Sequence, residues 1–265
     1  MTMIIAQITD THLSDVDAAD PKFSARAENL RACIADINDL DPLPDAVIHT
    51  GDITQHGRAA EFAHARALLQ TLEAPLYVIP GNRDGRDGVV RAFAVDGYIM
   101  PDYAFVHYAI DEHPVRLVAV DSLGNGIGPK GDFCHDRLAA LDATLAEAPA
   151  RPTVLFMHHP PFDVPAAPDP FAYQRRQAVV DLATVVSRHK QVIHIFAGHM
   201  HRPWTAMLGG VKASTVPSVA SDLRYGSYLP TMATQPVYQI HRFDGDEGFV
   251  NEPRLPGSGV SYPNT

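Results

Sequence analysis

Side chains that bind divalent metal ions follow several of the short apolar runs in this sequence of 265 residues. They are Asp10 and His12, Asp52, Asn82, His158 with His159, and His199 with His201. Carboxylate, amide and imidazole groups supply the oxygen and nitrogen ligands of first-row divalent cations. Two cations about 3.5 to 4 Å apart need a shared anionic oxygen, which a carboxylate such as Asp52 can provide. The combination therefore favours a site for divalent metal ions.

Each of these motifs also has an ordinary structural interpretation when it is taken alone. Residues 10–12 are compatible with a helix-capping acid beside a solvated imidazole, and residues 51–52 with a simple turn. The two histidines and two prolines at 158–161 are compatible with a rigid turn. Residues 198–201 are more specific, because histidines two apart in an extended segment point to the same side. The recurrence of all the motifs after strand-like runs favours the metal site.

Strands and helices alternate along the first part of the chain. Apolar runs predict buried strands at residues 3–9, 46–50 and 76–79. Between them, apolar residues at helical spacing predict one helix with Ser24 as its N-cap and a second helix over residues 62–72. This order is typical of a parallel sheet, in which side chains beyond the carboxyl ends of the strands converge on one crevice.

The rest of the chain predicts further strands and helices that make the sheet mixed. They are a hairpin of residues 103–110 and 115–120, a helix over 137–148, a strand over 153–157, a helix over 177–188, a strand over 192–197, and a hairpin of 204–208 and 211–215. Residues 251–265 are rich in Pro, Gly and Ser without periodicity, which predicts an extended tail.

The composition excludes several other classes of protein. With 46% hydrophobic and 20% charged residues, the chain is expected to fold around one large core. Cys33 and Cys134 are too few for a disulfide scaffold, so we expect a cytoplasmic protein. Residues 1–10 lack the features of a signal peptide, and no apolar run is long enough to span a membrane. The net charge of −10, with scattered basic residues, disfavours a nucleic-acid polymer as partner.

The order of the motifs resembles the calcineurin-like metallophosphoesterases, and most of all their bacterial branch of class III cyclic nucleotide and glycerophosphodiester phosphodiesterases. The resemblance rests on D-T-H at 10–12, G-D at 51–52, G-N-R-D at 81–84, H-H-P-P at 158–161 and G-H-M-H at 198–201. It implies an α/β fold, namely a four-layer α/β/β/α sandwich with two mixed sheets. Residues 1–215 would form the core, and residues 216–265 strands and a tail packed on that core or at a subunit interface.

Carried over by position, the resemblance implies a role for each metal-capable residue. One metal ion would be held by Asp10, His12 and His201, the other by Asn82, His158 and His199, and both by Asp52. His158 is preferred to His159 because the family's ligand lies two residues before the proline. His159 then either packs beside the ligands or contacts substrate. His56 and Arg58, which follow the Asp52 loop, either line the substrate pocket or are solvated loop residues without a role in binding. Asp121 is expected either to orient a ligand imidazole or to cap a helix.

Arg83 departs from the family pattern, which has a histidine beside the metal-binding asparagine. A histidine with a pKa of about 6.5 can protonate a leaving alkoxide, whereas an arginine stays charged. We expect Arg83 to bind substrate and to stabilise charge in the transition state. The alternative is that its guanidinium pairs with Asp84 or Asp87 and has no part in the chemistry.

The resemblance implies a phosphodiesterase that hydrolyses small molecules of the cyclic nucleotide or glycerophosphodiester type. Two divalent ions per chain, such as manganese, iron or zinc, would acidify a bridging water, and the resulting hydroxide would attack phosphorus. Asp52 and Arg83 would be the catalytic residues. The alternatives are a phosphomonoesterase on the same site and a catalytically silent metal-binding scaffold. The resemblance further implies a homo-oligomer, a dimer or larger, without a membrane partner.

Overall fold

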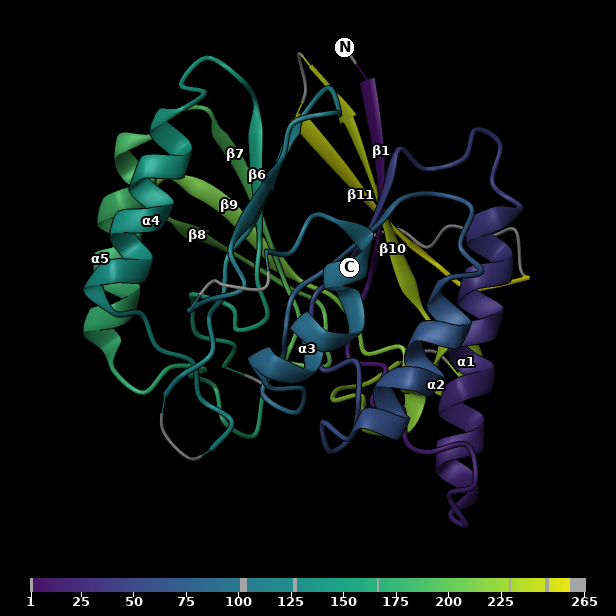
Figure 1. The fold of residues 1–265 in the computed structure, drawn as a ribbon. Coiled ribbons are helices and arrows are strands. Elements are labelled where there is room, and N and C mark those ends of the chain that lie inside the picture. Colours follow the sequence, from purple (N-terminus) through teal and green to yellow (C-terminus); the bar gives the residue numbers. More distant parts are fainter. Residues whose placement is uncertain are drawn as a thin grey trace.

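The computed structural model describes residues 2–100, 104–125, 128–165, 167–228, 230–245 and 248–257. Two sheets pack face to face, and helices cover the outer face of each, so the layers run α/β/β/α (Figure 1). Both sheets contain parallel and antiparallel strand pairs. The predicted four-layer sandwich with two mixed sheets is confirmed.

The first sheet has the strand order β11-β10-β1-β2-β3. Its strands are β1 (Thr2–Ile8), β2 (Ala46–His49), β3 (Leu76–Val78), β10 (Tyr238–Asp244) and β11 (Gly248–Arg254). The first three run parallel, whereas β10 pairs antiparallel with both β1 and β11. The helices α1 (Pro21–Asn38) and α2 (Ala59–Leu69) cover its outer face, and α3 (Arg86–Phe93) packs beside α2 (Figure 1).

The second sheet has the strand order β4-β5-β6-β7-β9-β8. Its strands are β4 (Tyr108–Ile110), β5 (Arg116–Ala119), β6 (Thr153–Phe156), β7 (Val192–Ala197), β8 (Trp204–Leu208) and β9 (Val211–Thr215). The central strands are parallel, and the edge strands β4 and β8 are antiparallel to their neighbours, as the predicted hairpins require. The helices α4 (His135–Ala146) and α5 (Arg176–Arg188) cover the outer face (Figure 1).

The helices begin and end at different residues from those predicted. The N-cap of α1 is Asp20 rather than Ser24, because the Asp20 side chain accepts a hydrogen bond from the Lys22 amide and Pro21 suits the first helical position. The helix α2 ends at Leu69 instead of residue 72. Short elements were not predicted: α3, α6 (Pro230–Thr234), and the 3-10 turns η1 (Ala94–Asp96) and η2 (Ser221–Leu223).

The predicted tail is partly wrong. Residues 251–254 belong to β11, which pairs along its whole length with β10, from Tyr238 opposite Arg254 to Asp244 opposite Gly248. Most of β11 is only half-buried, so its sequence lacks the clear alternation of a strand with one buried face. Residues 258–265 of the predicted tail, and residue 103 of the first predicted hairpin, lie outside the described residues.

The β10–β11 pair extends the same sheet that contains β1. The predicted boundary at residue 215, and any role of the following residues in a subunit interface, stay predictions. Among the described residues, no helix combines the length and apolar character needed to cross a bilayer.

Candidate metal centre

Strand ends from both sheets bring the metal-capable side chains together at one edge of the sandwich. Asp10 and Asp52 follow β1 and β2 of the first sheet, and His158 and His199 follow β6 and β7 of the second. The loops are joined by backbone hydrogen bonds, since the Asp10 amide donates to the Gly51 carbonyl at 3.0 Å. The candidate centre is therefore divided between the two sheets.

Backbone strain marks the same loops. Every described non-glycine residue with a positive φ is a predicted metal ligand, and the angles lie between 46° and 67°: Asp10, His12, Asp52, His199 and His201. The left-handed conformation costs an ordinary residue on the order of 1 kcal/mol or more, and it persists where the surrounding structure enforces it. Such strain gathers at functional sites, so it supports this set independently of residue type.

The first ligand group consists of Asp10, His12, Asp52 and His201, whose ligand atoms all lie within 4.8 Å of one another. The His201 Nε2 atom is 3.1 Å from Asp10 Oδ1 and 3.3 Å from His12 Nε2. The Nε2 atom of His12 is 3.5 Å from Asp52 Oδ2. These are two carboxylates and two imidazoles, nearly all of them buried.

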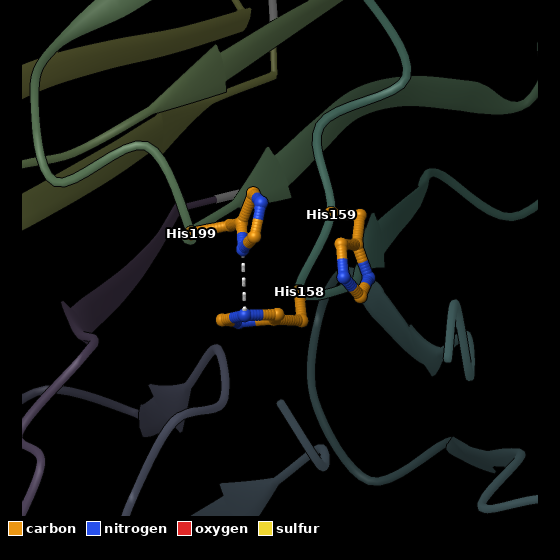
Figure 2. Close-up of side chains that lie close together, drawn as sticks. All are labelled: His158, His159 and His199. Carbon is orange, nitrogen blue, oxygen red and sulfur yellow. Dashed lines mark hydrogen bonds between the residues drawn. The ribbon is translucent and has the colours of Figure 1, made fainter. Parts of the chain in front are cut away.

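The second ligand group consists of Asn82, His158 and His199. The rings of His158 and His199 are nearly perpendicular, and His158 Nε2 lies 3.2 Å from His199 Nδ1 (Figure 2). The Asn82 Oδ1 atom lies 3.1 Å from the first of these nitrogens and 3.0 Å from the second. All three atoms therefore converge on one point.

Asp52 connects the two groups. Its Oδ2 atom faces His12, while its Oδ1 atom lies 3.5 Å from His158 Nε2 and accepts a hydrogen bond from the Arg83 amide at 2.8 Å. One carboxylate thus presents an oxygen to each group, which is the arrangement that a bridging ligand requires.

The hydrogen bonds on the far side of the rings show that these atoms fit metal ions. The Nδ1 atoms of His158 and His201 each lie 2.8 Å from a backbone carbonyl, of Thr50 and Leu223 respectively, and must donate protons there. The Nε2 lone pair of His201 then faces Asp10 Oδ1, and that of His158 faces Asn82 Oδ1. Because two acceptor atoms repel each other at this distance, a proton or a cation must lie between the two atoms of each pair. Ligands at about 2.0 to 2.2 Å from one cation are themselves about 3.0 to 3.5 Å apart, as these atoms are.

The electrostatics of the two groups differ. Burial raises the pKa of Asp10, but His201 and hydrogen bonds from His12 and His201 outweigh it and hold that pKa well below its ordinary value. Burial lowers the pKa of His201, but Asp10 outweighs it and the net shift is upward. The pKa of His199 lies well below its ordinary value because of burial and the neighbouring His159 and His158. His199 is therefore a neutral ligand in the second group.

His159 is buried behind the second group and differs from it in its bonding. Its ring centroid lies 4.8 Å from that of His158 and 4.6 Å from that of His199, so it is close enough to belong to the same group of candidate ligands (Figure 2). Its Nε2 atom is 2.8 Å from the Pro129 carbonyl, and its Nδ1 atom is 2.9 Å from the Ser122 hydroxyl. Both ring nitrogens therefore contact protein atoms, and a substrate contact stays a prediction.

The three predicted substrate contacts near Asp52 have different surroundings. Arg58 is exposed, and its guanidinium lies 3.8 Å from the Asp15 carboxylate. His56 is half exposed and its Nδ1 atom lies 2.7 Å from the buried Glu61 carboxylate. Arg83 is exposed. Within the described residues its guanidinium forms no ion pair with Asp84 or Asp87, and the Asp84 carboxylate instead accepts bonds from the amides of Ile53, Thr54 and Gly81.

Both predictions for Asp121 are wrong. Its carboxylate accepts hydrogen bonds from Arg86 and from the amides of Val106 and Leu123, so it neither orients an imidazole nor caps a helix. Sequence reasoning also missed the backbone carbonyls of Thr50 and Leu223, because a main-chain group has no signal in the residue type.

A cavity of about 450 Å³ adjoins Asn82. Three of the side chains that line it are cationic: Arg86, Arg91 and Lys130. Lys130 is paired with Asp169, and Arg86 with Asp121, whereas Arg91 forms no ion pair among the described residues. Asp84 and Asp87 also line the cavity, so Arg91 is its one cationic side chain without an ion pair among the described residues.

Comparison with known proteins adds independent evidence. A profile of the calcineurin-like phosphoesterases matches residues 3–203. The chain is 30% identical over 253 residues to the probable glycerophosphodiester phosphodiesterase GpdQ of Arcobacter nitrofigilis, covering 94% of this chain and 91% of the relative. It is 32% identical over 262 residues to a probable cyclic nucleotide phosphodiesterase of Rhodopseudomonas palustris, covering 92% and 90% of the two chains.

The fold is also found in solved structures. A dimetal phosphatase from Danio rerio superimposes with a TM-score of 0.70 at 16% identity and covers 98% of both chains. The chain belongs to the calcineurin-like phosphoesterase family, and its curated relatives support the bacterial class III branch.

Proposed function

We propose that this calcineurin-like phosphoesterase is a metal-dependent phosphodiesterase that hydrolyses small molecules of the cyclic nucleotide or glycerophosphodiester type. The observation that carries the proposal is the pair of ligand groups that share Asp52. The relatives named as glycerophosphodiester and cyclic nucleotide phosphodiesterases support the substrate class.

In this proposal the metal ligands have the roles expected from the sequence. One ion would be held by Asp10, His12 and His201, the other by Asn82, His158 and His199, and Asp52 would contribute to both. Two bound divalent cations lower the pKa of water and offset negative charge on the phosphoryl oxygens. The protein fixes the ligand atoms in advance through the Thr50 and Leu223 carbonyls, which orient the imidazole rings.

In this proposal the exposed Arg83 guanidinium and Arg91 in the adjoining cavity bind the substrate anion. The Arg83 amide bonds to Asp52, so this residue is attached directly to the bridging ligand while its guanidinium remains exposed. A permanently charged guanidinium stabilises negative charge but supplies no proton near neutral pH. Arg91 adds positive charge in the cavity beside Asn82, where an ester group would lie. His56, held by Glu61, presents its free ring edge toward solvent.

The decisive experiment compares two aryl esters with Mn(II) added to the purified protein. Bis(p-nitrophenyl) phosphate is expected to be hydrolysed with a higher kcat/KM than p-nitrophenyl phosphate. A preference of tenfold or more for the monoester would instead support the phosphomonoesterase alternative. The Arg83 guanidinium, which forms no ion pair with any described residue, favours that alternative by offering one more cation to a dianion. Absence of hydrolysis with two metal ions bound would support the silent scaffold.

The identity of the metal ions and the oligomeric state are proposed from the family resemblance, and the location from the low cysteine content. We expect manganese, iron or zinc, a cytoplasmic location, and a dimer or larger homo-oligomer. Elemental analysis of the protein as purified and light scattering of the intact chain measure the first and the last.

A further inference from the structure

The two sheets contribute separate parts of the candidate metal centre, so their relative position sets its geometry. Asp10, Asp52 and Asn82 come from loops of the first sheet, whereas His158 and His199 come from loops of the second. Between the sheets the contacts are largely apolar, and apolar contacts are not directional. A hydrogen bond across this interface, close to the ligands, would fix the distance between the ligands of the two sheets more closely than apolar contacts do.

Gln7 makes such a bond. It lies on β1 of the first sheet with no exposed surface, three residues before Asp10. Its amide nitrogen donates to the Ala197 carbonyl at the end of β7 in the second sheet, at 3.1 Å. The same nitrogen donates to the Thr50 hydroxyl at 3.0 Å. Thus one side chain bonds to residues at the ends of β2 and β7, directly before the loops that carry Asp52 and His199.

The orientation of the Gln7 amide is fixed by its partners. Because the Ala197 carbonyl can only accept a hydrogen bond, the amide nitrogen must face it, and the amide oxygen faces the opposite way. That oxygen accepts a bond from His241 Nε2 at 2.9 Å. The His241 ring is fully buried, stacks on Phe196 of β7 at 4.0 Å, and contacts the Asn251 amide through Nδ1.

The contacts continue to a metal ligand. The Thr50 side chain accepts from Gln7, and the Thr50 carbonyl lies 2.8 Å from His158 Nδ1. Buried polar groups of this kind are costly unless every one is bonded, and an apolar pair of similar shape would satisfy packing equally well. Stability of the core therefore does not account for a glutamine at this position.

From this arrangement we infer that Gln7 is a positioning residue, which holds the two sheets in register beneath the metal centre and so sets the spacing of the two metal ions. His241 supports it by fixing the amide orientation. The inference rests on the proposed two-metal function, and it concerns geometry rather than a step of the reaction.

The test uses Mn(II) titration of the full chain, followed by electron paramagnetic resonance of the bound ions. Coupling between two Mn(II) ions depends on their separation, so it reports the geometry without turnover. The variants are Gln7→Met, which keeps the shape of the side chain, and the double variant Gln7→Met/His241→Phe, which also removes the imidazole that would be left unpaired. Both are expected to bind the second Mn(II) roughly 10-fold or more weakly and to lose the coupled signal.

His194→Phe is the matched control. His194 is equally buried and also stacks on Phe196, but its hydrogen bond, to Ser214 at 2.9 Å, joins two strands of the second sheet. The His194→Phe substitution is expected to lower the Tm, while the Mn(II) affinities and the coupling between the two ions stay as in the wild type. If the double variant keeps both wild-type Mn(II) affinities and the coupled signal, Gln7 is only a packing residue. If the wild-type chain itself fails to bind two ions, the proposed function is wrong as well.

Discussion

Asp52 is the residue on which the two-metal interpretation depends most. It is the described carboxylate that faces both ligand groups, with one oxygen toward His12 and the other toward His158. A hydrogen bond from the Arg83 backbone amide holds the Asp52 carboxylate in this position. The φ of 52° at Asp52 shows that the backbone is strained where it presents this side chain. Replacing its charge while keeping its shape therefore tests the bridge itself.

Asp52→Asn is expected to lower turnover by more than the roughly 10- to 100-fold typical of a supporting residue, and to reduce the bound metal below two ions per chain. Asn82→Ala should weaken one site only, because it removes a single neutral oxygen. Steady-state kinetics and elemental analysis measure both effects. Wild-type turnover with two ions in Asp52→Asn would contradict the bridging assignment.

With Arg83 in place of a histidine, we expect the rate of hydrolysis to depend strongly on the pKa of the leaving alcohol. Without a general acid, which typically contributes on the order of 10²- to 10⁴-fold, the rate should fall steeply as the pKa of the leaving alcohol rises. Arg83→Ala should slow all diesters, because charge stabilisation is lost. Arg83→His should recover activity mainly on alkyl diesters, with a new pH dependence near neutrality. Kinetics across aryl and alkyl diesters measure this, and unchanged rates in Arg83→Ala would remove the residue from the mechanism.

At the scale of elements, the loops after the strands are packed so closely that small residues are required in them. A Cβ atom added to Gly198 would lie 2.2 Å from the Thr9 hydroxyl and 2.8 Å from Asp10 Oδ2. Gly198→Ala is therefore expected to displace Asp10 and to weaken metal binding by roughly 10- to 100-fold, as measured by Mn(II) titration.

Gly210→Ala is the control for that substitution. Gly210 lies in the turn between β8 and β9, with a φ of 88° and open space around it, so alanine strains the backbone without touching a ligand. It should lower the Tm and leave metal affinity unchanged. Equal loss of metal affinity in both variants would attribute the effect of Gly198→Ala to general destabilisation.

The sequence predicts most of the elements because buried parallel strands are continuous apolar runs, as β1, β2 and β6 are. It does not predict β11, which is half-buried and contains Pro253, or α3, which is short and buries few apolar side chains. The candidate ligands were identifiable because they directly follow strands. Gln7 was not, because one polar residue inside an apolar run gives no indication of what it contacts across the sheet interface.

At the scale of the whole molecule, the interface between the sheets contains histidines as well as apolar side chains. Burial, with a smaller contribution from the neighbouring His241, lowers the pKa of His194 to about 3, and burial lowers the pKa of His241 to about 4. Both rings are therefore neutral in the folded protein near pH 7. In the unfolded chain they would bind protons at a pKa of about 6.5.

This difference makes the folded state sensitive to acid. As the pH falls below about 6.5, the unfolded chain takes up protons that the folded chain excludes, so the free energy of unfolding decreases, by about 1.4 kcal/mol per pH unit for each such histidine. The loss continues until the folded-state pKa values of about 3 and 4 are reached. Above pH 6.5 neither ring contributes a pH dependence, because both are neutral in both states.

His194→Phe removes one of these groups and should make the pH dependence shallower by about 1.4 kcal/mol per pH unit between roughly pH 5.5 and 4.5. Urea unfolding of the metal-free chain across that range measures the slope, and comparison with the wild type cancels the contribution of the ligand residues. His135→Gln is the control, because the His135 side chain is 94% exposed and its surroundings barely change on unfolding. Parallel curves for His194→Phe and the wild type would mean that the buried ring takes up a proton in the folded state, and that the interface between the sheets admits water.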